Sequence, residues 1–218
     1  MGLAHSPSIV MNGLVLCLDA GNRKSYPGIG TTWTDLSGRG NNGTLINSPT
    51  YNSSTGGYLS FNGTTQYATC SGTPLNVTSY TKSVWFRLST LATNNNLVSC
   101  SPGHFMYFSA TNKLYCGHSD WGNYQAYPST TNFSTATWYN ACLTFNTTDG
   151  MVLYVNGIQD STYTAVKTQA AGGGIEIASF GAGNFLTGDI SHVSVYNRSI
   201  TASEIQQNFN ALRGRFGI

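Results

Sequence analysis

Residues 117–127, with the sequence GHSDWGNYQAY, gather aromatic rings, amides and a carboxylate in one turn-prone segment. Sites that bind carbohydrate use this mixture, because a ring stacks on the apolar C–H face of a sugar while amides and carboxylates hydrogen-bond its hydroxyls. A structural interpretation stays open beside it, in which the rings cover one end of a core and keep their polar tips in water. The candidate sugar-binding residues are Asp120, Trp121, Asn123, Tyr124 and Tyr127.

Catalysis finds less support in the residue pattern. Hydrolysis of a glycosidic bond needs two carboxylates roughly 5 to 10 Å apart. No two of the eight acids stand at i and i+2, the spacing that places two side chains on one face of a strand. The four histidines form no HxH or HExxH pattern, and no GxSxG motif occurs. We therefore expect a non-enzyme with no catalytic residues and no histidine-built metal site, although two distant acids could still meet in the fold.

Residues 38–43 (GRGNNG) match the dinucleotide-binding pattern GxGxxG by letter only. That site requires a strand before the glycines and a helix after them, so that the phosphates meet the helix N-terminus. Here a polar turn precedes the glycines and a strand-like run, residues 44–46, follows. The motif therefore predicts a glycine-rich turn.

The composition indicates the scaffold that must position these groups. Of the 218 residues, 40% are hydrophobic and only 8% are charged, against roughly a quarter charged in ordinary soluble proteins. The formal net charge is only +2 and no basic cluster occurs, so the sequence does not predict a surface that binds nucleic acid or an acidic membrane. Ser, Thr, Asn and Gly fill the polar positions, and these residues favour turns over helices. The composition predicts a β-protein with an uncharged polar surface.

Short strand-like runs recur about every ten residues between clusters of Gly, Asn and Ser, which is typical of a sandwich rather than of βαβ units. No stretch resembles a linker, so we expect one domain. The predicted strands are residues 13–18, 58–61, 83–88, 97–99, 105–108, 113–116, 137–145, 151–155, 175–177 and 190–196.

One helix is predicted near the end of the chain. Residues 201–204 (TASE) fit the capping box, in which the Thr hydroxyl and the Glu carboxylate each satisfy an orphan backbone N–H. Ile205, Phe209 and Leu212 follow at i, i+4 and i+7 and make one apolar stripe, and Gly214 is placed to end the helix. We expect this helix to be structural.

The five cysteines are odd in number and contain no CxxC pair, and several stand inside apolar runs. This pattern predicts buried, unpaired thiols rather than a disulfide framework. Residues 1–12 show no signal-peptide pattern, and the chain has no run of about 20 apolar residues. We expect a protein that folds in a reducing cytoplasm and is not secreted.

Six blocks of sequence, taken together, resemble the laminin-G-like branch of the concanavalin A-like jelly rolls. They are residues 13–22, 33–45, 57–63, 138–139 with 143–145, 153–157 and 193–205. The resemblance implies an all-β, two-sheet antiparallel jelly-roll sandwich over residues 13–212 with one short C-terminal helix, flanked by an N-terminal arm (1–12) and a C-terminal tail (213–218). It implies no activity by itself, because this fold hosts lectins, hydrolases and structural modules.

Some relatives in this branch bind calcium, and this sequence departs from their pattern. Many carry Asp where Asn62 stands and an acidic pair where Ser191 and His192 stand. Losing those carboxylates weakens the site, because a hard cation prefers anionic oxygens. No cofactor is therefore expected, and calcium is only weakly supported. The acids that could still supply one ligand each are Asp19, Asp35 and Asp189.

The amino-acid sequences of the first blocks and of residues 208–218 are similar to those of virion proteins from tailed bacteriophages, especially phages of marine or cyanobacterial hosts. This resemblance implies a structural virion protein, first of all a head-decoration or cement protein on the particle surface, assembled in the host cytoplasm. The alternative is a carbohydrate-binding tail or fibre module that recognises host surface glycans. Expected partners are capsid or tail proteins, surface glycans and further copies of the chain, with no nucleic acid and no membrane.

Both ends of the chain are candidates for contact with a partner subunit. The arm could add to the edge of a neighbour's sheet, and the tail combines charge with apolar anchors of the kind enriched in interfaces. The alternative is that both ends fray. The candidate interface residues are Ile9, Val10, Met11, Arg213, Arg215 and Phe216.

Overall fold

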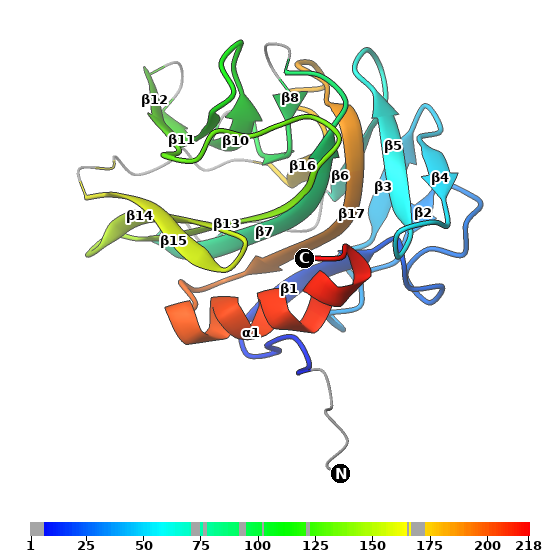
Figure 1. The fold of residues 1–218 in the computed structure, drawn as a ribbon, viewed down its shortest axis with the longest axis horizontal. Helices are drawn as coiled ribbons and strands as arrows, with labels where there is room; N and C mark the ends of the chain where they lie inside the picture. Colours follow the sequence, from blue (N-terminus) through cyan, green and yellow to red (C-terminus); the bar gives the residue numbers. More distant parts are fainter. Residues whose placement is uncertain are drawn as a thin grey trace.

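The computed structural model describes residues 7–70, 75, 78–91, 95–101, 103–120, 123–164, 166 and 173–218. Antiparallel strands form two layers (Figure 1). One layer is an eight-stranded sheet. Its strands are β1 (Leu14–Asp19), β4 (Thr50–Asn52), β5 (Tyr58–Asn62), β7 (Ser79–Leu88), β13 (Trp138–Asn146), β14 (Gly150–Val155), β15 (Ile158–Tyr163) and β17 (Thr187–Tyr196).

The facing layer contains a four-stranded and a five-stranded sheet, which meet at an isolated bridge between Cys100 and His104. The strands of the four-stranded sheet are β8 (Asn95–Asn96), β10 (His104–Phe108), β11 (Leu114–Asp120) and β12 (Asn123–Pro128). Those of the five-stranded sheet are β2 (Thr32–Trp33), β3 (Gly43–Ile46), β6 (Tyr67–Cys70), β9 (Val98–Ser99) and β16 (Ile175–Ile177). The predicted all-β antiparallel sandwich with one C-terminal helix is confirmed.

The order of the large sheet is β15-β14-β13-β7-β17-β5-β4, with β1 also paired to β17. Its two longest strands, β7 and β17, are paired over most of their length and buried along nearly all of it. A register shift between Ile190 and His192 keeps Ile190, Val193 and Val195 on the core side of β17.

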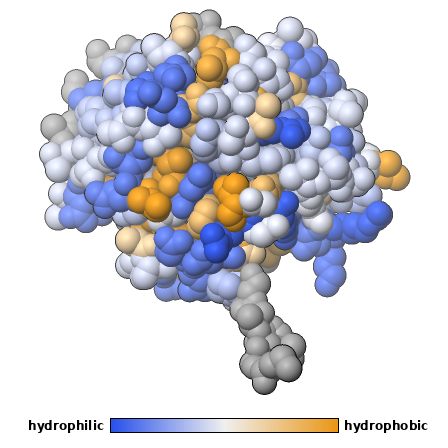
Figure 2. Space-filling view, viewed as in Figure 1, coloured by the Kyte–Doolittle hydropathy of each residue, from blue (hydrophilic) through white to orange (hydrophobic). Residues whose placement is uncertain are grey.

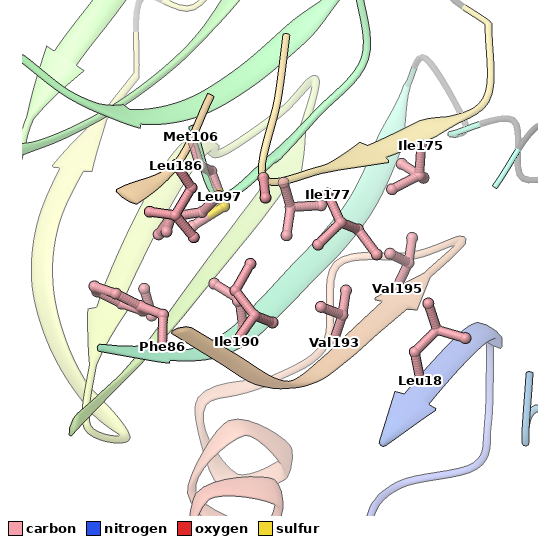
Figure 3. Packing of buried hydrophobic residues seen from close by; sticks show 14 of the residues in the cluster. Leu18, Phe86, Leu97, Met106, Ile175, Ile177, Leu186, Ile190, Val193 and Val195 are labelled. Carbon is pink, nitrogen blue, oxygen red and sulfur yellow. The ribbon is translucent and has the colours of Figure 1, made fainter. Parts of the chain in front are cut away.

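The core fills the space between the layers (Figure 3). Phe86, Ile190 and Val193 of the large sheet point toward Met106 and Ile177 of the opposite layer. All five side chains are fully buried. Burial of each contributes about 1.5–3 kcal/mol relative to exposure, so this cluster is a main source of stability.

The helix α1 (Ala202–Leu212) covers the other face of the large sheet, next to β1 (Figure 1). The predicted capping box is present, and Ile205, Phe209 and Leu212 are buried as expected. The prediction for Gly214 is wrong: α1 runs into a 3-10 turn, η1 (Arg213–Arg215), and the left-handed residue that follows is Gly217, with φ +72°. Among the described residues, no helix is long and apolar enough to cross a membrane.

The C-terminal residues pack onto the domain instead of forming a free tail. The Phe216 ring stacks on Trp85 with the centroids 4.2 Å apart, and it is only 8% exposed. Arg215 forms an ion pair with Asp19 at 2.7 Å. The expectation that residues 213–218 form a tail outside the packed unit is therefore wrong for Arg215 and Phe216, because the Phe216 ring is buried against the sheet face that α1 leaves open. Arg213 stays at the surface, with its guanidinium over the Phe209 ring.

The described part of the N-terminal arm also contacts the domain. The Val10 N–H donates to the Asn208 side chain at 2.8 Å, and the Val10 carbonyl accepts from the Tyr196 hydroxyl at 2.9 Å. Ile9 and Val10 are half-buried against the helix side of the sheet, whereas Met11 is 57% exposed. Residues 8–12 therefore form a strap, and residues 1–6 lie outside the described residues. Small apolar patches lie among hydrophilic residues on the face shown in Figure 2.

Candidate functional site

The aromatic segment expected to bind sugar forms the hairpin of β11 and β12, and the hairpin splits it between two faces. Tyr124 lies opposite Ser119, and Tyr127 lies opposite Cys116, which points into the core. Residues three apart on a strand face opposite sides. Tyr124 is accordingly on the outer face and 60% exposed, whereas Tyr127 stacks on Tyr163 of β15 with the centroids 4.4 Å apart. The structure does not bring these two tyrosines together.

For the other three predicted sugar-binding residues, Asp120, Trp121 and Asn123, the structure describes no side chain. Asp120 and Asn123 are backbone partners at the end of the hairpin. Their side chains, like Trp121 as a whole, lie outside the described residues. Tyr124 is therefore the member of the set around which a site can be built.

A pocket of about 240 Å³ lies beside Tyr124, on the outer face of the four-stranded sheet. Three rings contact one another there, with centroid separations of 6.0 Å for Phe105 and Tyr124, 6.2 Å for Phe105 and Phe180, and 6.4 Å for Tyr124 and Phe180. The rings come from β10, from β12 and from the loop between β16 and β17. The described residues that line the pocket are Asn96, Phe105, Tyr107, Tyr124, Ala126, Phe180 and Asn184.

Phe105 forms the floor of this pocket, and Gly117 makes that possible. A Cβ atom at position 117 would lie 2.7 Å from the Phe105 ring and 1.8 Å from the Gln125 carbonyl oxygen. Because glycine has no such atom, the Phe105 ring can lie close over the backbone of β11, where it is only 4% exposed. Tyr124 and Phe180 then stand at the edges of the pocket.

The loop that carries Phe180 is held in a strained shape. Ala178, Ala182 and Asn184 all have positive φ, at +65°, +52° and +49°. The Glu176 carboxylate stabilises this shape by accepting from the Ser179 hydroxyl at 2.7 Å and from the Ala182 N–H at 3.1 Å. Each left-handed residue other than glycine costs on the order of 1–3 kcal/mol, and such strain concentrates at ligand clamps.

Two asparagines supply the polar part of the lining. The buried Asn96 donates from Nδ2 to the Asn184 carbonyl at 2.9 Å, which ties β8 to the loop. Its Oδ1 accepts from the Ser99 hydroxyl at 3.1 Å. The Asn184 side chain is exposed at the pocket. The described lining is thus aromatic and amide in character and carries no charged side chain.

The carboxylates with described side chains are engaged in structural roles. Asp189 accepts from Arg87 and from Ser60, and Asp19 pairs with Arg215. Asp35 holds the glycine-rich turn, where it accepts from backbone N–H groups that include those of residues 37 and 41. The others that accept protein hydrogen bonds are Asp149, Asp160, Glu176 and Glu204. Within the described ranges, no group of three or more His, Cys, Asp or Glu could hold a metal ion.

All five cysteines are buried with free thiols. Burial raises the pKa of Cys17, Cys70, Cys116 and Cys142 to about 12. These thiols stay protonated at neutral pH and behave as small core residues. The predicted unpaired state agrees with the structure.

A polar cluster lies on the core side of β10 and β11, away from the pocket. The Lys82 ammonium donates to His104 Nδ1 at 2.9 Å and to the Val98 carbonyl at 3.2 Å, and Tyr80 and His118 share a hydrogen bond of 2.8 Å. Burial lowers the pKa of Lys82 to about 7, and burial together with Lys82 holds the pKa of His104 well below its usual value. These fully buried groups support the fold.

Sequence reasoning missed most of the pocket. Phe105, Phe180 and the two asparagines stand far from Tyr124 along the chain, in segments that strand pairing brings together. A usable signal was present in β10, where Phe105 and Tyr107 alternate with the core residues Met106 and Phe108. That alternation marks a strand with aromatic rings on both faces.

The comparisons with known proteins agree with the fold. The sequence profile described as the concanavalin A-like lectin/glucanases superfamily matches residues 62–206. A search of curated proteins finds no significant match. The structure is similar to Trypanosoma rangeli sialidase in complex with the inhibitor DANA, with a TM-score of 0.67 and 18% identity over 94% of this chain and 35% of that chain.

Two toxin domains are also similar. The receptor-binding domain of botulinum neurotoxin type G gives a TM-score of 0.70 with 14% identity, covering 90% of this chain and 51% of that one. The binding domain of paraclostridial mosquitocidal protein 1 gives 0.71 with 17% identity, covering 92% and 52%. The chain thus spans about a third to a half of these proteins, and at such identities the likeness shows the fold alone. From the profile match, which covers most of the sandwich, the chain belongs to the concanavalin A-like lectin/glucanase superfamily.

Proposed function

We propose that this domain binds a neutral sugar in the pocket beside Tyr124 and catalyses no reaction on it. The observation that carries the proposal is the convergence of Phe105, Tyr124 and Phe180 from two strands and a separate loop, next to the exposed Asn184. Apolar walls with a few placed polar groups are the usual composition of a small-molecule site. A sugar offers the matching surfaces, namely an apolar C–H face and a rim of hydroxyls.

The arrangement assigns a part to each side chain. The rings of Tyr124 and Phe180 would take the C–H face, with Phe105 beneath them as a buried floor. The Asn184 amide would donate to one hydroxyl and accept from another. The loop that holds Phe180 and Asn184 is fixed by Glu176 before any ligand arrives, so little ordering cost would fall on binding.

The charge of the site favours a neutral ligand. The described lining carries neither Lys nor Arg, and the carboxylate of Glu176 holds the adjacent loop. An acidic sugar would lose hydration without gaining an ion pair. That the two toxin domains are described as receptor-binding or binding domains supports a binding role for this architecture.

Attachment to a phage particle is a prediction from sequence resemblance alone, and no contact or comparison described above favours it. The alternative, carbohydrate recognition, is the better supported of the two expectations. The absence of catalysis, the reducing compartment of folding and a partner at the chain ends stay as proposals. Phe216 and Arg215, engaged within the domain, would have to leave their contacts to serve such a partner.

A glycan array followed by calorimetry tests the proposal. Tyr124→Ala removes roughly 40 Å² of ring contact at about 25 cal/mol/Å², or about 1 kcal/mol, and should weaken binding about fivefold. Tyr127→Ala is the matched control, because this tyrosine lies on the same strand but faces the other side. Unchanged affinity in Tyr124→Ala, equal loss in both variants, or no binding to any neutral glycan would refute the proposal.

A further inference from the structure

Tyr107 belongs to the pocket and also to a second pair of rings beyond it. It lies directly opposite Tyr115 of β11, and the two rings are stacked with centroids 5.6 Å apart and planes inclined by 28°. Both side chains are half-buried on the outer face of the four-stranded sheet. Tyr115 is outside the described lining of the pocket, so the aromatic surface continues past the pocket along the sheet.

The neighbouring strand leaves this surface open. Ala126 and Pro128 of β12 pair with Gly117 and Tyr115 and are exposed. The β12 residues beside the Tyr107–Tyr115 pair are thus short or flat. A ligand that extends from the pocket over Ala126 would therefore contact the tyrosine pair, because no long side chain of β12 lies between them.

We infer that Tyr107 and Tyr115 form a second sugar subsite, so that the ligand is a chain of at least two sugar rings rather than a single one. The inference rests on the proposed function of the pocket. The pocket, at about 240 Å³, is smaller than the roughly 300–1,000 Å³ of sites that enclose drug-sized ligands. It suits one ring, and any further ring of a chain lies on the sheet surface outside.

The geometry of the pair fits that role. Adjacent strands lie about 4.8 Å apart, so Tyr115 extends the surface by one strand from Tyr107. Rings at this separation and inclination overlap only in part, which leaves each with a face or edge for contact. The hydroxyl of each tyrosine can donate to a sugar oxygen at the outer rim.

The test uses neutral oligosaccharide ladders of one to four units: malto-, cello-, manno- and N-acetylchito-oligosaccharides, titrated into the full chain by calorimetry. We expect the ladder that binds to gain at least tenfold in affinity from one unit to two. Tyr115→Ala should abolish this gain while leaving the affinity for one unit within twofold, and Tyr115→Phe should keep most of it. Tyr51→Ala, which removes a half-buried tyrosine packed on Tyr26 elsewhere, is the matched control.

The outcomes distinguish failure of the second subsite from failure of the pocket itself. Equal affinity for one and several units, or a chain-length gain that Tyr115→Ala leaves intact, overturns the second subsite and leaves the pocket standing. No binding of any ladder, together with no binding on a neutral glycan array, overturns the pocket and the subsite together. The melting temperature of each variant shows whether the sheet is intact, and Tyr115→Phe preserves the ring if the alanine variant fails to fold.

Discussion

Replacing Lys82 by methionine should change how the stability of this protein depends on pH. Lys82 is fully buried, and burial lowers its pKa from the ordinary 10.5 to about 7. In the unfolded chain the same group has its ordinary pKa. Between these two pH values the unfolded chain therefore holds a proton that the folded protein has released, and the contribution of Lys82 to stability rises with pH. Below pH 7 both states hold the proton, and this contribution stays at its lowest.

The magnitude follows from that displacement of the pKa. For a folded-state pKa of about 7, the contribution of Lys82 grows by roughly 1 kcal/mol between pH 7.5 and 8.5. Methionine has no proton to release. The buried thiols, which begin to ionise in the unfolded chain toward pH 9, act on both proteins alike and cancel in the comparison. The gap between the unfolding free energies of the two proteins should therefore shift by roughly 1 kcal/mol in favour of the wild type.

Urea unfolding followed by tryptophan fluorescence at pH 7.5, 8.0 and 8.5 measures this gap. Lys24→Met, at an exposed lysine, is the control and should show no pH-dependent gap. At any single pH the Lys82 variant also loses hydrogen bonds to Val98 and His104, so the change with pH is the informative quantity. A gap that stays constant within about 0.4 kcal/mol, near the error of extrapolation, would refute the reasoning.

Three further predictions follow from the packing of the chain ends and from the missing acids. Phe216→Ala should lower the free energy of unfolding by about 3 kcal/mol, because the ring packs on Trp85 and Trp138 at 4.2 and 4.9 Å; an unchanged urea midpoint would show that these contacts add nothing. Deleting residues 1–11 should leave a folded domain that is less stable by about 1–2 kcal/mol, since the strap's hydrogen bonds are lost, and deleting residues 1–6 is the control; equal stability of the two truncations would contradict this. Chelation of calcium should leave the melting temperature unchanged, since Asn62 caps its own turn through backbone N–H groups instead of offering a carboxylate; a fall of several degrees would disprove it.

Much of the scaffold could be predicted because its signals are local. Alternating apolar residues between turn residues define strands without reference to the rest of the chain. The capping box at residues 201–204 and the stripe of Ile205, Phe209 and Leu212 likewise fix the helix and its buried face. The glycine-rich turn at residues 38–43 was predicted for the same reason, and the structure shows the backbone N–H of Asn41 in this turn donating to Asp35.

The candidate site could be predicted only in part, because its members are distant in sequence. Tyr124 was predicted from its aromatic segment, but its partner Phe105 depends on the register in which β10, β11 and β12 pair, and its partner Phe180 depends on the strained loop before β17. The same pairing turned Tyr127 away from Tyr124. A local sequence pattern shows that side chains alternate between the two faces of a strand. It does not show which residues of other strands and loops will lie beside them on the outer face of the sheet.

By itself, the sequence determined the class of fold, the helix, the central part of the longer strands and the burial of the five cysteines, since composition, period and capping act over a few residues. Short strands such as β4, β6 and β15 were not predicted. Only the tertiary structure decided which face of each strand is buried against another part of the domain. Burial of Lys82 and His104 in the core shows this, because both residue types are polar and neither lies in a pattern that requires burial. The same holds for Phe216, which becomes buried because Trp85 and Trp138 stand where the chain ends. Strand pairing brings together residues a hundred positions apart, and that choice depends on the packing of the whole domain rather than on any local stretch of it.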